Sequence, residues 1–188
     1  MYDFYSTKAF ENAFTYTGSD LGAVWSREKT CFRLWAPTAK AVSVNLYKSG
    51  TAGTDDLIQR VPMEPSVNGT WVAEKAGDLN GIYYTYLVSV GGKTVEACDP
   101  YARTTGVNGR RAMVIDLEST NPENWNRDRN PHVGQNVVDA VIYELHIRDL
   151  SSHRTSRIRN KGKFLGLTET RKHTKTGQPT GLDHMKDL

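Results

Sequence analysis

Hydrophobic residues recur at every second position in much of residues 22–117, in short runs separated by turn residues. In one such run, Phe32 and Leu34 share a face, and Pro37 then ends the strand ladder. A period of two predicts strands with one buried face, and no helical period is sustained in this region. About seven short strands within roughly 100 residues predict an immunoglobulin-like β-sandwich. The alternation is clear in three runs: residues 30–36, 41–47 and 81–90.

Two glycine-containing stretches in this region predict turns. Gly91 and Gly92 lie between two alternating runs, and paired glycines supply the positive φ angles of a tight hairpin. Asn68, Gly69 and Thr70 match the glycosylation sequon, but we interpret them as a turn.

The pattern changes towards the C-terminus. Residues 139–143 are almost continuously apolar, as expected of a strand that is covered on both faces in a parallel sheet. After a connection rich in Gly and Lys, Thr180 and Asp183 are spaced as a capping box, in which Asp183 reaches back to the Thr180 N–H. Apolar residues then fall along one face of a predicted helix: Leu182, Met185 and Leu188.

These patterns divide the chain into four predicted segments. A polar stretch interrupted by prolines is typical of a linker and separates the β-rich region from the C-terminal one. The segments are an N-terminal extension at residues 1–20, a β-sandwich at 21–120, a linker at 121–137 and the start of a second domain at 138–188.

The amino-acid composition favours a soluble globular protein. The 188 residues are 38% hydrophobic and 24% charged, which is typical of a soluble globular protein. A net charge of +3 does not call for nucleic acid. The sequence predicts neither a secretory signal nor a membrane-spanning segment, so we expect a cytoplasmic protein. We expect Cys31 and Cys98 to be reduced thiols.

Several longer segments, in this order, resemble type I pullulanases, the debranching enzymes of glycoside hydrolase family 13. The resemblance implies a β-sandwich of the family-48 carbohydrate-binding type, followed by a catalytic (β/α)₈ barrel of which this chain holds only the first βα unit. The segments are FRLWAPTAKAVSVNLY (32–47), GTWVAEKAGDLNGIYYTYLV (69–88), ACDPYARTTGVNGRRAMVIDL (97–117), VIYELHIRDLSS (141–152), NKGKFLGLTET (160–170) and TGLDHMKDL (180–188).

The implied activity is hydrolysis of α-1,6-glucosidic branch points in pullulan, starch or glycogen with retention of configuration, and the implied partner is an α-glucan. Retention requires two carboxyl groups about 5–5.5 Å apart. The family carries its catalytic carboxylates on barrel strands four, five and seven, and this chain has neither those strands nor the YNWGYDP signature. We therefore expect an N-terminal portion that is inactive alone, with no catalytic residue, metal site or cofactor.

The titratable residues in VIYELHIRDLS (141–151) are candidates for a metal site or a substrate-binding site. Glu144 and His146 would share one strand face, but three or four ligands would be needed for a metal. The C-terminal ends of barrel strands are where active sites form. We therefore predict His146 and Asp149 as substrate-binding residues of the complete enzyme.

Aromatic side chains are the usual partners of sugar rings. Four are candidates by type, although packing in the core or between domains is favoured for each, and the tryptophan pair of many glucan-binding modules is not evident. They are Trp35, Trp71, Tyr83 and Tyr84.

Residues 151–188 contain nine Lys or Arg and three acidic residues. Without interleaved aromatic residues, this excess of basic residues favours a solvated loop over a nucleic-acid surface.

Two alternatives to a pullulanase fragment stay open: an isoamylase or glycogen-branching enzyme fragment, and a stand-alone glucan-binding module.

Overall fold

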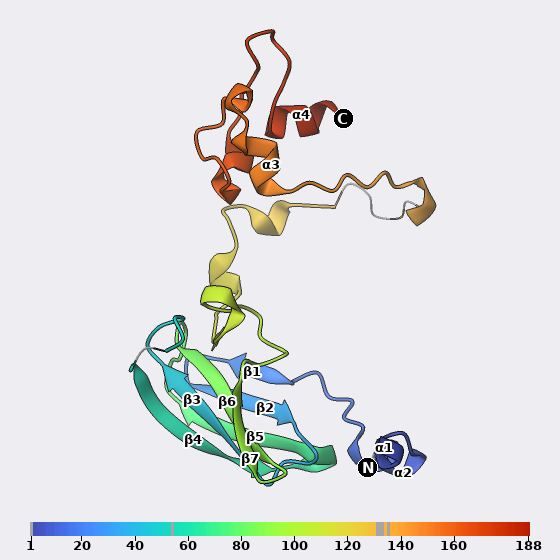
Figure 1. The fold of residues 1–188 in the computed structure, drawn as a ribbon, viewed down its shortest axis with the longest axis vertical. Coiled ribbons are helices and arrows are strands. Elements are labelled where there is room, and N and C mark those ends of the chain that lie inside the picture. Colours follow the sequence, from blue (N-terminus) through green and yellow to red (C-terminus); the bar gives the residue numbers. More distant parts are fainter. Residues whose placement is uncertain (1, 54, 131–133, 135) are drawn as a thin grey trace. The chain divides into compact units, whose positions relative to one another are not determined.

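The structure is a computed structural model that describes residues 2–53, 55–130, 134 and 136–188. The chain forms two compact units, Met1–Arg127 and Asp128–Leu188 (Figure 1). Part of the predicted linker, at residues 131–133 and 135, lies outside the described residues. No helix in the described segments has the length and apolar character needed to cross a membrane.

The first unit is built around an antiparallel sheet of eight strands. The strand order is β1-β2-β5-β4-β3-β6-β7, and β8 pairs with β6. The strands are β1 (Gly22–Trp25), β2 (Lys29–Trp35), β3 (Ala41–Tyr47), β4 (Leu57–Pro65), β5 (Thr70–Ala76), β6 (Tyr83–Val90), β7 (Lys93–Ala97) and β8 (Ala112–Met113).

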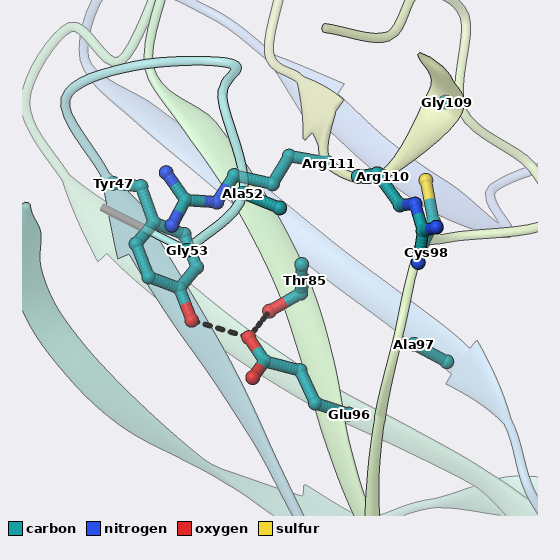
Figure 2. Close-up of a pocket in the computed structure, with 10 residues that line it drawn as sticks. All are labelled: Tyr47, Ala52, Gly53, Thr85, Glu96, Ala97, Cys98, Gly109, Arg110 and Arg111. Carbon is teal, nitrogen blue, oxygen red and sulfur yellow. Dashed lines mark hydrogen bonds between the residues drawn. The ribbon is translucent and has the colours of Figure 1, made fainter. Parts of the chain in front are cut away.

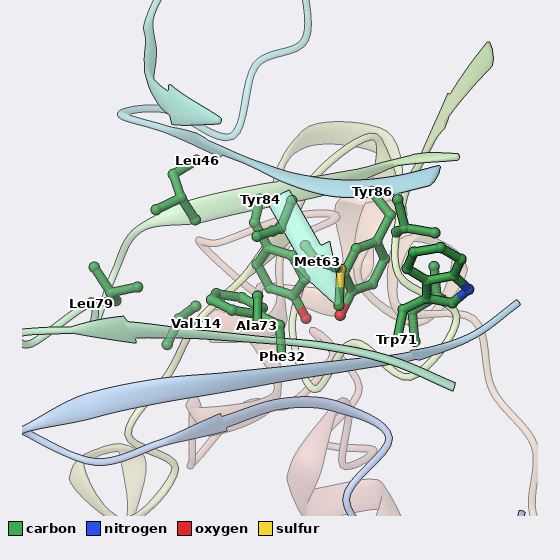
Figure 3. Packing of buried hydrophobic residues seen from close by; sticks show 13 residues of the cluster. Phe32, Leu46, Met63, Trp71, Ala73, Leu79, Tyr84, Tyr86 and Val114 are labelled. Atoms are coloured by element: carbon green, nitrogen blue, oxygen red, sulfur yellow. The ribbon is translucent and has the colours of Figure 1, made fainter. Parts of the chain in front are cut away.

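The long strand β4 joins the two halves of this sheet. Most of β4 pairs with β3, whereas Glu64 and Pro65 at its end pair with β5. The sheet therefore curls on itself and encloses a core between its halves (Figure 3). The predicted mainly-β class is confirmed, with a curled sheet that is continuous through β4.

The enclosed core includes many of the residues that the period-two pattern assigns to one face, although Val90, at the end of the β6 pattern, is 40% exposed. Phe32 is 1% exposed and makes an edge-to-face ring contact with Tyr84 of β6, which makes a second one with Tyr86. Burying each large apolar side chain contributes about 1.5–3 kcal/mol. Of the aromatic candidates, Trp71 and Tyr84 lie in this core, as expected.

Both predicted turns are confirmed. Gly91 and Gly92 have φ angles of 57° and 76° and connect β6 to β7. Asn68 and Gly69, with φ angles of 53° and 73°, lie in the turn between β4 and β5. A Cβ atom on Gly69 would lie 2.5 Å from Pro37 Cβ, so this turn tolerates only glycine.

The N-terminal extension contains helices that the sequence pattern did not reveal: α1 (Tyr2–Tyr5) and α2 (Lys8–Phe14). Thr7 is the N-cap of α2, and its side chain accepts a hydrogen bond from Phe10 N at 3.1 Å. Asn68 Nδ2 donates to Ala13 O at 3.3 Å, which attaches α2 to the β4–β5 turn.

The predicted strand at residues 139–143 does not form. Residues 140–146 have no regular secondary structure, and helix α3 (Ile147–Ser152) follows directly. Val141 and Ile142 are 96% and 89% exposed. A strand needs a neighbour to accept its backbone hydrogen bonds, and no strand in the described part of the second unit pairs with this segment.

The predicted C-terminal helix is confirmed as α4 (Leu182–Asp187), but its capping box is wrong. Asp183 Oδ2 accepts from Lys172 N at 2.6 Å, and Thr180 N donates to Lys172 O at 2.8 Å. Because Lys172 occupies both groups, Asp183 cannot cap Thr180, and Gly181 is the N-cap.

Polar contacts organise much of the second unit. The Glu169 carboxylate accepts hydrogen bonds from Arg159 N at 3.0 Å and Asn160 N at 2.8 Å, and pairs with Lys172 Nζ at 3.0 Å. The backbone N–H donors of Asn160 and Arg159, with Lys172, lower the pKa of Glu169 from 4.5 to about 2. The carboxylate is therefore ionised and holds the loop together.

Candidate functional site

A polar hollow of about 340 Å³ lies on the side of the sheet that faces away from the core (Figure 2). Strands β3, β6 and β7 and the loops beside them provide its walls. The lining residues are Tyr47, Ala52, Gly53, Thr85, Glu96, Ala97, Cys98, Gly109, Arg110 and Arg111.

Glu96 is the acidic group of the hollow and is surrounded by donors. Thr85 Oγ1 donates to Glu96 Oε1 at 2.5 Å, and the Tyr47 hydroxyl donates to the same oxygen. Asn45 Nδ2 adds a longer contact of 3.4 Å. Asn45, Tyr47 and Thr85 alternate with core residues of β3 and β6, so the strand period directs all of them to this face.

These contacts determine the charge of the hollow. Burial would raise the pKa of Glu96, but the hydrogen bonds from Thr85, Tyr47 and Asn45 outweigh it, and the pKa lies below its usual value. Burial and the hydrogen bond to Glu96 raise the pKa of Tyr47. At neutral pH the site therefore holds a carboxylate beside a neutral phenol.

Arg111 closes one side of the hollow. Its guanidinium carbon lies 3.6 Å from the centroid of the Tyr47 ring. Arg111 Nη1 also donates to Asp56 Oδ1 and to Ser49 O, each at 2.8 Å. Its side chain is 5% exposed, so these contacts fix the guanidinium in place. One face of Tyr47 is thus covered by Arg111 and is not open to a sugar ring.

This chemistry suits binding rather than hydrolysis. A retaining glycoside hydrolase needs two carboxyl groups about 5–5.5 Å apart. Among the described lining residues only Glu96 is acidic, and nearby Asp56 is engaged by Arg111. The hollow offers hydroxyl, carboxylate and guanidinium groups, which are the chemical types that hydrogen-bond with sugar-like hydroxyls.

The predicted substrate-binding residues lie elsewhere, in the second unit. His146 is the N-cap residue of α3, and its Nδ1 lies 3.9 Å from Asp149 Oδ2. Both side chains are exposed, and neither lines the hollow of Figure 2. Within the described segments, no group of three or more His, Cys, Asp or Glu residues is arranged to hold a metal ion.

Sequence reasoning did not identify the residues of the hollow. The alternation that assigns Tyr84 and Tyr86 to the core also directs Thr85 outward, so a polar outer face could have been found. The contact of Arg111 with Ser49 spans 62 residues and depends on the folded loops. No local pattern in the sequence predicts it.

Comparison with known families shows what the first unit resembles. Residues 20–102 match carbohydrate-binding module 48, described as the isoamylase N-terminal domain. The first unit is therefore similar to this module over residues 20–102. This module spans the sheet from before β1 to just after β7 and includes most residues of the hollow.

Several pullulanases are similar in sequence to most of this chain. The pullulanase of Bacillus subtilis (strain 168) is 35% identical over 97% of this chain, and pullulanase 1 (chloroplastic) of Arabidopsis thaliana is 36% identical over 93%. The chain covers 24% and 19% of these proteins. Isoamylase SU1 (chloroplastic) of Zea mays is 26% identical over 89% of the chain, which covers 23% of that protein.

Solved structures of pullulanases are also similar to this chain. The apo pullulanase of Paenibacillus barengoltzii matches with a TM-score of 0.86 and 49% identity, over 96% of this chain and 27% of that one. The pullulanase of Bacillus acidopullulyticus matches with a TM-score of 0.84 and 42% identity, over 93% of this chain and 21% of that one. The resemblance to pullulanases is confirmed, and the chain matches their N-terminal module region while spanning about a quarter of their length.

Proposed function

We propose that this chain is the glucan-binding region of a pullulanase-like glycoside hydrolase that cleaves α-1,6-glucosidic branch points in pullulan, starch or glycogen. The observation that carries this proposal is the alignment of nearly the whole chain, module and second unit together, with pullulanases. A module alone would account only for residues 20–102.

The ligand class is α-glucan. Pullulanases of this structural group were solved with maltotriose, with maltotetraose, and with maltohexaose and α-cyclodextrin. The polar hollow of this chain supports the same class, because its carboxylate, hydroxyl and guanidinium groups match sugar hydroxyls. The covered face of Tyr47 makes that hollow a hydrogen-bonding site rather than a stacking platform.

The second unit is, in this proposal, the opening strand and helix of a catalytic (β/α)₈ barrel. Val137, Val138, Val141 and Ile142 are all more than four-fifths exposed. Neighbouring barrel strands and helices would cover such a segment on both faces. His146 and Asp149 would then lie at the end of the strand that faces the substrate, and we retain them as substrate-binding residues.

An activity assay tests the catalytic part of the proposal. We expect the isolated chain, incubated with pullulan, to release no reducing ends above buffer, because hydrolysis needs a pair of carboxyl groups and the family carries them on barrel strands four, five and seven. The complete gene product, assayed in parallel, should release maltotriose. Maltotriose from the isolated chain, or none from the complete product, would contradict the proposal.

A stand-alone glucan-binding module is the second candidate, and the module match at residues 20–102 favours it. Both candidates predict retention on glycogen or β-cyclodextrin, so retention alone does not separate them. The pullulan assay of the complete gene product separates the two candidates, because only a pullulanase releases maltotriose. The isoamylase alternative is less well supported, since the identity to isoamylase SU1 is 26%, against 35% to the Bacillus pullulanase.

A further inference from the structure

A second hollow in the first unit, of about 350 Å³, lies between α2, the end of β2 and the chain after β7. It shares no lining residue with the hollow of Figure 2. Aromatic side chains dominate its walls. They are Tyr5, Phe10, Phe14, Tyr16, Trp35 and Tyr101.

The hollow is held in shape by hydrogen bonds around Trp35. The indole Nε1 donates to Phe14 O at 2.7 Å and to Asn68 O at 3.1 Å, so the ring is fixed between α2 and the β4–β5 turn. Phe10 contacts Trp35 edge-to-face, with ring centroids 6.4 Å apart. The Trp35 and Phe10 rings are therefore held in place before any ligand arrives, which lowers the entropy cost of binding.

Several of these rings are nevertheless open to solvent. Trp35 is 40% exposed and Tyr101 is 50% exposed. Polar groups stand among them, namely the Glu11 carboxylate and the hydroxyls of Tyr5 and Tyr101. Open aromatic faces with hydrogen-bonding groups at their margin suit a ligand that has both an apolar face and hydroxyl groups.

We propose that this aromatic hollow is a second α-glucan-binding site, in which rings such as Trp35 and Tyr101 pack against the C–H faces of glucose units. The proposal deepens the proposed function, on which its ligand class rests. Four of the six rings precede residue 20, so the site is built partly outside the module match: Tyr5, Phe10, Phe14 and Tyr16.

The two hollows differ in the groups that they offer. In the first, Arg111 covers the Tyr47 ring, and recognition relies on hydrogen bonds. In the second, Glu11 is the one charged group among the described lining residues, and ring faces dominate. An anionic membrane surface requires basic residues, and the lining of the second hollow has none. A sugar chain satisfies both the rings and the hydroxyls.

Titration of the whole chain with maltohexaose tests the site. Tyr101→Ala and Tyr5→Ala should each weaken binding about three- to tenfold, because each removes an aromatic contact. Tyr101→Phe keeps the ring and removes only the hydroxyl, so it should weaken binding less than Tyr101→Ala does. Trp125→Ala removes an exposed ring from outside both hollows and should leave the affinity unchanged. Thermal melting of each variant establishes that it is folded.

A spectroscopic readout reports on the site directly. The chain has four tryptophans, and the indole N–H signal of Trp35 is identified by its loss in Trp35→Phe. We expect maltohexaose to shift this signal. Parent-like affinity in Tyr101→Ala and Tyr5→Ala, with an unmoved Trp35 signal, would overturn the inference even if the chain binds sugar elsewhere. Absence of maltohexaose binding at millimolar concentration would also overturn it, whereas pullulan hydrolysis by the complete gene product would still support the proposed function.

Discussion

The two units of the chain contain similar kinds of apolar residues but use them differently. In the first unit, Phe32, Tyr84 and Tyr86 are enclosed by a sheet that supplies its own neighbours. In the second unit, Val141 and Ile142 are exposed, and Ile158 is the one buried large hydrophobic among its described residues. Apolar sequence produces a core only where the same unit provides the surface that covers it.

The largest expected effect contrasts a buried ring with an exposed one. Phe32→Ala should lower the free energy of unfolding of the first unit by about 3–5 kcal/mol, because it leaves a cavity in the core. Phe164→Ala removes a ring that is 80% exposed in the second unit, and should change stability by less than about 0.5 kcal/mol. Chemical denaturation of both variants, followed by circular dichroism, compares them. Equal losses would contradict the contrast between the units.

A smaller loss is expected at the buried ion pair of the first unit. Arg111→Met removes the guanidinium that neutralises Asp56, whose side chain is 14% exposed, while Ser49 N still donates to Asp56 Oδ2 at 2.7 Å. The loss should be roughly 3 kcal/mol, because a largely buried carboxylate loses its opposite charge. Lys172→Met alters an ion pair of the second unit in which backbone donors still hold Glu169, and should cost less. Denaturation midpoints measure both. A larger effect for Lys172→Met would be the contrary result.

The smallest effect is a difference in pH response. The pKa of Glu169 is lowered to about 2, so its contribution to the second unit is complete above its ordinary value of 4.5 and is lost as the pH falls towards 2. Burial raises the pKa of Asp99 in the first unit, so its contribution is complete below its ordinary pKa of 3.8 and is lost as the pH rises through the raised value. Acid therefore acts on the two groups in opposite directions.

Amide signals followed by NMR during an acid titration measure this response. We expect the signals of Arg159 and Asn160, which donate to Glu169, to lose dispersion between pH 4.5 and about 2. Glu169→Gln should remove that transition, and Asp99→Asn should leave it unchanged. A transition that persists in Glu169→Gln would assign the pH response to another group.

The sequence predicted the elements that depend on local interactions and failed for those that depend on residues farther along the chain. Strand β6 and the Gly91-Gly92 hairpin depend on local alternation and local backbone freedom, and both were predicted. The strand at residues 139–143 has the right local pattern but needs neighbours, and the prediction was wrong. The capping box at Asp183 was wrong because Lys172, eleven residues earlier, occupies its carboxylate.

The candidate sites follow the same rule. Thr85 and Glu96 could have been found from strand alternation, whereas the closure of the hollow by Arg111 depends on loops that meet only in the fold. Trp35 was a candidate by residue type, but its partner Phe14 lies on a helix that the pattern did not reveal. The roles of His146 and Asp149 in substrate binding stay predictions.

Hydrogen–deuterium exchange along the isolated chain distinguishes a first unit that folds on its own core from a second unit whose apolar segment at residues 137–146 is left uncovered. We expect slow exchange in the backbone amides of β2, β3, β5 and β6, and rapid exchange throughout residues 137–146. Protection of residues 137–146 as strong as that of the sheet would contradict this expectation.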